Sequence, residues 1–170
     1  MPQENTKSAE SALIGIRQND AGLELNLTTR PAPDVPATVR SLLRLRLASW
    51  HVTGDLADDI LLCAVELVSN ACDAAPDTEV AFRARLDPAT GAVWIGAWDT
   101  CPEVPAARRP ELTIEDIDAL PDDHVFGGWG LPLVAALAAD CGVTRTPVGK
   151  WVHAVFPPDP RRAVRAGPGR

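Results

Sequence analysis

The chain has 170 residues, of which 46% are hydrophobic and 23% are charged, and its formal net charge at pH 7 is −7. This length suits one domain with a hydrophobic core and leaves little room for a second. The negative charge argues against DNA or RNA as a main partner. No run approaches the roughly 20 apolar residues of a membrane span, and residues 1–20 lack the pattern of a signal peptide. We therefore expect a cytoplasmic protein without a nucleic-acid or membrane partner.

The beginning of the chain, residues 1–20, is polar and has no hydrophobic period, so we expect it to be disordered. Residues 23–27 follow, in which leucines alternate with polar residues as in a half-buried strand. A helix is predicted from a cap at Asp34 to about Trp50, because its apolar residues are spaced by three and four. A second helix should begin near Asp55, among acidic residues that suit a helix start, and end before Pro76.

The second half of the chain predicts a hairpin, with strands at 80–86 and 92–98. Residues 99–128 then read as a long loop rich in proline and acid, with a short helix capped by Thr113 inside it. A loop of this length in a compact domain is usually functional, often as a lid over a ligand.

A helix at 131–139 and strands at 142–146 and 150–156 complete a domain that we place at residues 21–156. Residues 157–170 carry four arginines against one aspartate and are expected to form a disordered basic tail. Hairpins dominate and the helices are few. This order favours an α+β fold: a two-layer α/β sandwich with a mainly antiparallel mixed sheet and helices on one face.

The four cysteines, Cys63, Cys72, Cys101 and Cys141, form no Cys-x-x-Cys pair. Their spacing argues against a zinc site and against a disulfide framework. We expect Cys63 and Cys72 to pack as small hydrophobic side chains on one helix.

Three polar residues interrupt the apolar end of the second predicted helix. Glu66, Asn70 and Asp73 are spaced by four and three, which places them on one stripe of a helix. An amide and carboxylates in this pattern suit the binding of a hard cation and the orientation of a water molecule. Taken alone, Glu66 and Asn70 fit equally well a buried polar pair that braces neighbouring loops.

Two further segments carry candidate site residues. Asp99 ends the strand at 92–98, where an aspartate often does no more than terminate a strand. Gly127 to Gly130 lead into the last helix, and glycines at such a junction let the backbone approach a phosphate, toward which the first amides of the helix point. Either segment alone is a weak signal.

Together and in this order, the three segments resemble the GHKL ATPase superfamily, with its Bergerat fold and histidine-kinase-like ATPase domain. The branch that they resemble most is that of the anti-sigma-factor serine/threonine kinases of actinobacterial type. Glu66 and Asn70 match the first motif of the family, Glu-x-x-x-Asn. The resemblance implies that Glu66 polarises the attacking hydroxyl or water, and that Asn70 binds the Mg²⁺ on the phosphates of ATP. Asp73 matches an Asn-x-x-Asp form found in other branches of the family.

The second motif of the family is Asp-x-Gly-x-Pro, whose aspartate accepts a hydrogen bond from the amino group of adenine. Asp99 matches this aspartate, but Cys101 replaces the glycine, and its side chain could crowd the adenine pocket. The third motif, Gly-x-Gly-Leu, matches Gly128, Gly130 and Leu131.

The resemblance implies an ATP-binding regulatory protein that transfers the γ-phosphate to a serine of an anti-anti-sigma-type protein. It also implies that a sigma factor could be a partner, and relatives often form homodimers. The alternative is an inactive interaction module, with or without nucleotide, that works by protein contacts alone. Cys101, Ala74 in place of the usual histidine, and Trp129 in place of the usual arginine favour this alternative.

Overall fold

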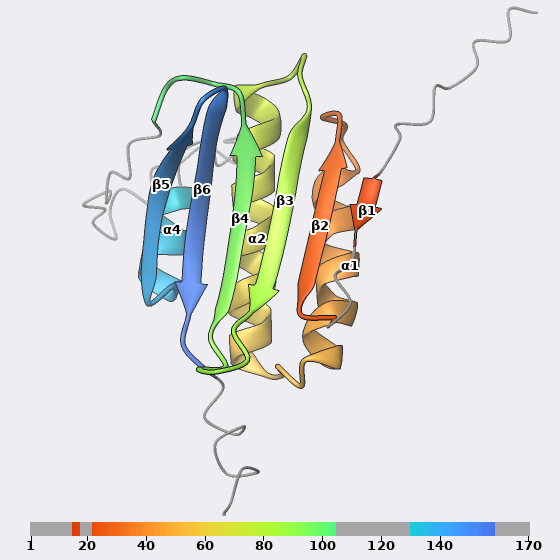
Figure 1. The fold of residues 1–170 in the computed structure, drawn as a ribbon, viewed down its shortest axis with the longest axis vertical. Helices are drawn as coiled ribbons and strands as arrows, with labels where there is room; N and C mark the ends of the chain where they lie inside the picture. The colour runs from red at the N-terminus through yellow and green to blue at the C-terminus, as the bar shows by residue number, and fades with distance from the viewer. Residues whose placement is uncertain (1–14, 18–21, 105–129, 159–170) are drawn as a thin grey trace, which may run out of the picture.

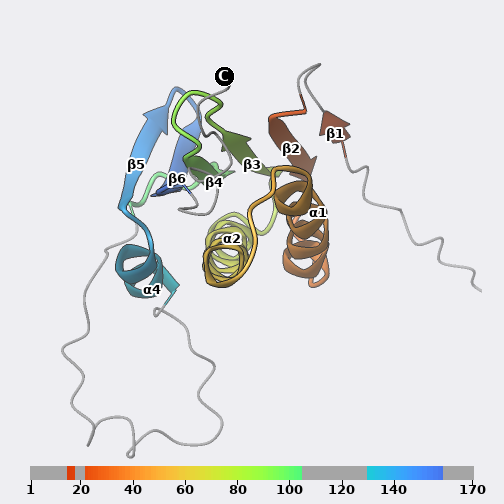
Figure 2. The same ribbon diagram turned by 90° about the horizontal axis from the view of Figure 1, so that it is seen from below.

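The computed structural model describes residues 15–17, 22–104 and 130–158. The elements follow in the order β1 (Gly15–Arg17), β2 (Glu24–Thr29), α1 (Val35–Ser49), α2 (Asp55–Ala74), β3 (Val80–Leu86), β4 (Val93–Asp99), α4 (Gly130–Leu137), β5 (Asp140–Thr146) and β6 (Gly149–Phe156). The strands form one six-stranded sheet in the order β1-β2-β3-β4-β6-β5 (Figure 1). The helices all lie on one face of this sheet, so that the fold has two layers (Figure 2).

The predicted fold class, a two-layer α+β sandwich, is confirmed. The expected mixed character of the sheet is not found, since all five pairings between the described strands are antiparallel. A connection through a single helix brings the chain back to the end of the sheet where it started, so the two strands that it joins are parallel. Here the connection from β2 to β3 contains two helices, α1 and α2, and these strands pair antiparallel.

The prediction for residues 1–20 is wrong in one place, because Gly15–Arg17 form the strand β1. This strand pairs with β2, with Ile16 opposite Leu27. Without β1, the strand β2 would present a free edge of unpaired backbone groups, which a short added strand satisfies. The predicted lid, its helix at Thr113, and the tail from residue 159 onward lie outside the described residues.

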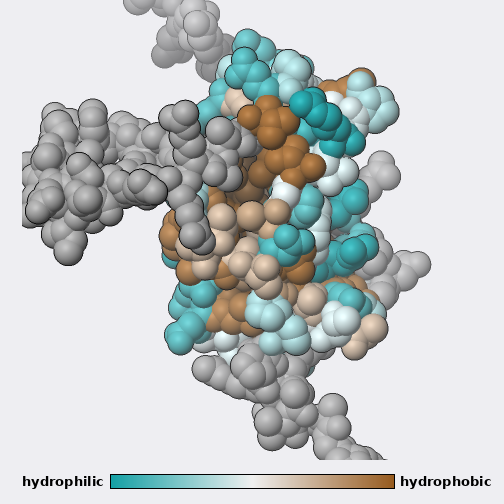
Figure 3. Space-filling view, turned by 90° about the vertical axis from the view of Figure 1, so that its left-hand side faces the viewer, coloured by the Kyte–Doolittle hydropathy of each residue, from teal (hydrophilic) through white to brown (hydrophobic). Residues whose placement is uncertain are grey.

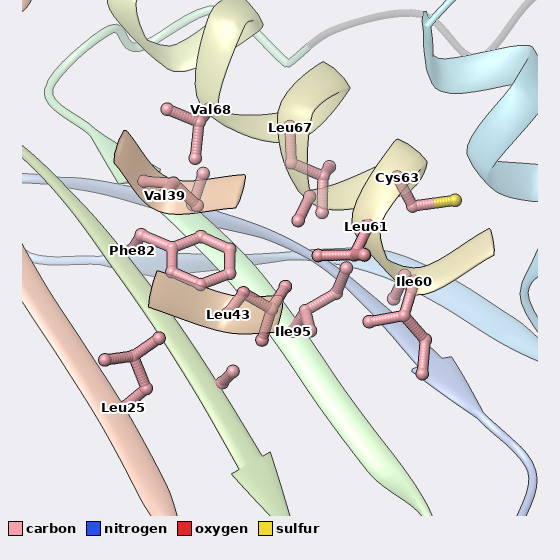
Figure 4. Close-up of a cluster of buried hydrophobic side chains, with 14 of the residues drawn as sticks. Leu25, Val39, Leu43, Ile60, Leu61, Cys63, Leu67, Val68, Phe82 and Ile95 are labelled. Atoms are coloured by element: carbon pink, nitrogen blue, oxygen red, sulfur yellow. The ribbon is translucent and has the colours of Figure 1, made fainter. Parts of the chain in front are cut away.

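The helices pack on the sheet because each presents one apolar stripe. The buried residues of α1 are Val35, Val39, Leu43 and Leu47, and those of α2 are Ile60, Leu61, Cys63, Ala64, Leu67, Val68 and Ala71. They meet side chains at alternate positions of the strands, including Leu25, Phe82 and Ile95 (Figure 4). This packing fixes α2 above β4 and leaves its C-terminal end next to the end of that strand.

The helix boundaries agree closely with the predictions up to α2. Asp34 stands at the N-cap of α1, as expected, although its side chain makes no capping hydrogen bond. The last helix is shorter than predicted and ends at Leu137. It ends early because the backbone then enters the sheet, where the Ala139 amide donates to the Val155 carbonyl at 2.9 Å. None of the helices in the described ranges is both long enough and apolar enough to span a bilayer.

Cys63, Cys72, Cys101 and Cys141 are all free. Cys63 is fully buried and Cys72 packs against the core, so both behave as small hydrophobic residues. Burial raises the pKa of the Cys63 thiol to about 12, with smaller contributions from Asp59, Glu66 and Cys141. The thiol is therefore neutral and unreactive at physiological pH.

Candidate functional site

A cavity of about 550 Å³ lies where the C-terminal end of α2, the end of β4, the start of α4 and the first half of β6 meet. Its volume falls within the range of small-molecule binding sites. Its lining combines apolar residues such as Leu67 and Val152 with polar residues. Figure 3 views the molecule from the side that carries β5 and α4, where hydrophobic surface is broad.

The structure brings together most of the site residues predicted from the sequence. Asn70 and Asp73 from α2, Asp99 from the end of β4 and Leu131 from the first turn of α4 all line the cavity. Gly130 begins α4 next to Leu131. The predicted convergence of three distant segments is therefore present in the fold.

Three predicted residues, Gly130 among them, are not placed in the cavity wall. Glu66 lies one helical turn before Asn70 on α2, where it is half-buried, but it does not line the cavity. Gly128 lies outside the described residues, as does Trp129. Cys101 lines the cavity, as its place in the second motif suggests, and the cavity remains open beside it.

The most unusual feature of the cavity wall is a buried ion pair. Lys150 stands directly opposite Asp99 in the ladder between β4 and β6. Its Nζ donates to Asp99 Oδ1 at 2.5 Å, and the side chains of both residues are only 3% exposed. Attraction between two such charges is strong where water is excluded, and it offsets the cost of burying them.

The backbone of Cys101 completes this arrangement. Its amide donates to Asp99 Oδ1 at 2.8 Å, and its carbonyl accepts from Lys150 Nζ at 2.9 Å. Asp99, Cys101 and Lys150 thus form a closed ring of hydrogen bonds at the wall of the cavity. The residue that replaces the glycine of the second motif contributes its backbone to the site.

Sequence reasoning missed the role of Lys150, although the pattern of β6 contains a signal. Lys150, Val152, Ala154 and Phe156 occupy alternate positions of the strand, and the last two are buried against the core. Alternate residues of a strand point to one face, so a lysine in this set must point inward. An inward lysine needs an anion, and Asp99 is the carboxylate opposite it.

The charge of the cavity is otherwise negative. Asp73 and Glu103 line it as exposed carboxylates, while the charges of Asp99 and Lys150 cancel. A polyanionic ligand would therefore need a cation to offset these carboxylates. No group of three or more His, Cys, Asp or Glu residues in the described part of the chain could hold a metal by itself. Mg²⁺ commonly binds through one or two protein oxygens with phosphates and water, and the amide oxygen of Asn70 fits this use.

Gly149 allows β6 to approach β4 closely beside the ion pair. A Cβ atom at this position would overlap the backbone carbonyl oxygen of Asp99 and lie 2.9 Å from the ring of Trp98. Only a residue without a side chain fits here while Lys150 reaches Asp99.

Gly149→Ala is therefore expected to lower the free energy of unfolding by about 1–3 kcal/mol, because the two strands must move apart. Urea denaturation followed by circular dichroism measures the change. Gly142→Ala is the matched control, since its Cβ would meet only the side chain of His153, at 3.3 Å. Equal stability of the two variants would show that the strands do not approach as closely as described.

Comparison with known proteins shows which family the chain belongs to. A search of curated proteins found no match. A family model described as a histidine kinase-like ATPase domain matches residues 27–156. The match covers most of the chain, from β2 to β6, and includes Asn70, Asp73, Asp99 and Leu131 of the cavity. The two-layer sandwich agrees with the family, and the protein therefore belongs to the histidine kinase-like ATPase domains of the GHKL superfamily.

Proposed function

We propose that this domain binds ATP together with Mg²⁺ in the cavity between α2, β4 and α4, and that it acts as a regulatory protein. One observation carries the proposal: a single cavity collects Asn70 and Asp73 from α2, Asp99 from β4 and Leu131 from α4, three segments that are far apart in the sequence. Membership of the family makes ATP the expected ligand.

The arrangement suggests how ATP would lie. The base would occupy the end of the cavity at Asp99, and the phosphates would lie toward Asn70 and the first turn of α4. Backbone amides at a helix N-terminus favour anions, and Gly128 and Gly130 would allow a close approach. Bound at Asn70, Mg²⁺ would neutralise phosphate charge that the carboxylates of Asp73 and Glu103 otherwise repel.

The more specific proposal is a serine/threonine kinase that phosphorylates an anti-anti-sigma-type protein and also binds a sigma factor. Its support is the resemblance of the three motifs to the anti-sigma-factor branch. Glu66 would act as the general base toward the acceptor serine. Phosphoryl transfer needs mainly positioning and neutralisation of charge, so few catalytic groups suffice. A cytoplasmic location and a homodimer belong to the same proposal.

The second candidate is an interaction module that does not turn over ATP. The ion pair favours it, because Lys150 already binds one carboxylate oxygen of Asp99, the residue that reads adenine in the family. The cavity wall also contains the carboxylates of Asp73 and Glu103, which pair with no cation in the described part of the chain and therefore repel a polyanion. The two candidates differ first in whether ATP binds at all.

We expect isothermal titration calorimetry to show micromolar ATP binding that depends on Mg²⁺. Asn70→Ala should weaken it at least about tenfold, which corresponds to ~1.4 kcal/mol, because the magnesium loses its protein ligand. Asn26→Ala is the matched control, since this asparagine lies on β2 away from the cavity and binds Arg83.

The titration contradicts the proposal if wild-type protein binds no ATP at millimolar concentration. It contradicts the role of Asn70 if the two asparagine variants bind ATP and Mg²⁺ equally well.

A further inference from the structure

We propose that Lys150 is a specificity-determining residue that, together with Asp99, recognises the pairing edge of adenine. Lys150 would donate a hydrogen bond to the ring nitrogen N1, while Asp99 accepts one from the adjacent amino group. This inference rests on the proposed binding of ATP and adds to it a base-reading cation on β6.

The ammonium group of Lys150 has a donor to spare. A lysine side chain carries three N–H donors. Two of them are used, one by Asp99 Oδ1 at 2.5 Å and one by the Cys101 carbonyl at 2.9 Å. The third has no partner within residues 15–17, 22–104 and 130–158, and Lys150 lines the cavity. A ligand in the cavity can accept from it.

The carboxylate of Asp99 likewise keeps an acceptor. Both described hydrogen bonds, from Lys150 Nζ and from the Cys101 amide, go to the same oxygen, Oδ1. The other oxygen, Oδ2, receives none from the described part of the chain, and Asp99 also lines the cavity. The ion pair therefore offers a ligand one donor and one acceptor side by side.

Adenine has the complementary pattern. Its amino group is a donor, and the neighbouring N1 is an acceptor. In the same orientation guanine places a carbonyl oxygen against the carboxylate and an N–H against the ammonium, so that both contacts become repulsive. A site built on buried hydrogen-bonding groups rejects a ligand that leaves them unpaired. The ion pair thus selects adenine over guanine when the sugar and phosphates are held in one position.

The side chains of Asp99 and Lys150 are held in position before a ligand binds. Both side chains are 3% exposed, the register of β4 and β6 sets Lys150 opposite Asp99, and the Cys101 backbone holds both. Groups that are held in place before the ligand binds lose little entropy on binding, and they discriminate best.

The test uses the full chain and base analogues of ATP, all with Mg²⁺. 1-Deaza-ATP replaces N1 by C–H, and we expect it to bind roughly tenfold to hundredfold more weakly than ATP, the effect of one hydrogen bond to a charged group. Purine riboside triphosphate, which lacks the amino group, should lose a similar factor through Asp99. 7-Deaza-ATP, altered on the other edge of the base, is the control and should bind like ATP.

The double variant Asp99→Leu/Lys150→Met assigns the effect to the pair. It removes the donor of Lys150 without leaving a single buried charge, and it brings no new hydrogen-bond donor to the position of N1. We expect its affinities for ATP and 1-deaza-ATP to differ by less than about twofold, whereas a purely structural role for Lys150 would leave the wild-type ratio unchanged.

The outcomes separate this inference from the proposed function. Equal binding of ATP and 1-deaza-ATP by the wild type, or tight binding of GTP, overturns the role of Lys150 and leaves ATP binding intact. If none of the nucleotides binds, the proposed function itself fails, and the inference fails with it.

Discussion

Lys150→Met is expected to lower the free energy of unfolding by about 3–5 kcal/mol, because it leaves a carboxylate buried without its counter-ion. The side chain of Asp99 is 3% exposed, so water in the cavity reaches too little of the carboxylate to replace the ammonium group. The Cys101 carbonyl also loses its donor. A domain of ordinary stability, about 5–15 kcal/mol, would lose a large share of it.

Urea denaturation at neutral pH measures this loss, and a double-mutant cycle identifies its cause. Asp99→Asn/Lys150→Met should recover most of the stability, because the stranded charge is gone and two neutral side chains of similar size remain. Lys150→Met alone should therefore be less stable than the double variant. A loss below about 1 kcal/mol in the single variant would mean that the pair is solvated in solution, as surface ion pairs are.

Most of the fold could be predicted because its elements have strong local patterns. The alternation of Leu25 and Leu27 marks β2, and the spacing of Val39, Leu43 and Leu47 marks α1, in each case through the face that is buried. The strand β1 has only three residues, too few for any period, and exists because β2 offers it a free edge. The wholly antiparallel pairing is likewise a property of the assembled sheet.

The candidate site could be predicted where one helix or one strand end places the residue. Asn70 and Asp73 share the last turns of α2, and both reach the cavity. Glu66 lies one turn earlier, beside Cys63, and the cavity does not extend along the helix to it. Spacing on a helix fixes the stripe but not how far along that stripe a cavity extends.

Lys150 illustrates what local patterns cannot supply. It lies 51 residues from Asp99 in sequence, and the two meet only because β4 and β6 are neighbours in one register. A shift of one residue in that register would turn Lys150 to the other face of the sheet. The match to the second family motif identified Asp99, whereas its pairing with Lys150 is set by the register of β4 and β6.

Glu66→Ala tests whether the protein is an enzyme. If Glu66 is the general base of the proposed kinase, its removal should slow release of phosphate from ATP by about 10²–10⁴-fold, the usual contribution of such a base. Affinity for ATP should change little, because Glu66 does not line the cavity. Radiolabelled γ-phosphate release with Mg²⁺, with water as the acceptor, measures the rate without the partner protein, and calorimetry measures the affinity.

Asp59→Ala is the matched control for Glu66→Ala, and it makes the outcome decisive. Asp59 lies on the same stripe of α2, and both carboxylates raise the pKa of Cys63, so they share one neighbour. Each variant removes one carboxylate from this stripe, but only Glu66 stands one turn from Asn70. Equal slowing in both variants would assign the effect to the helix and not to catalysis. Wild-type protein that binds ATP but releases no phosphate would instead support the interaction module, in which Glu66 serves only to brace α2.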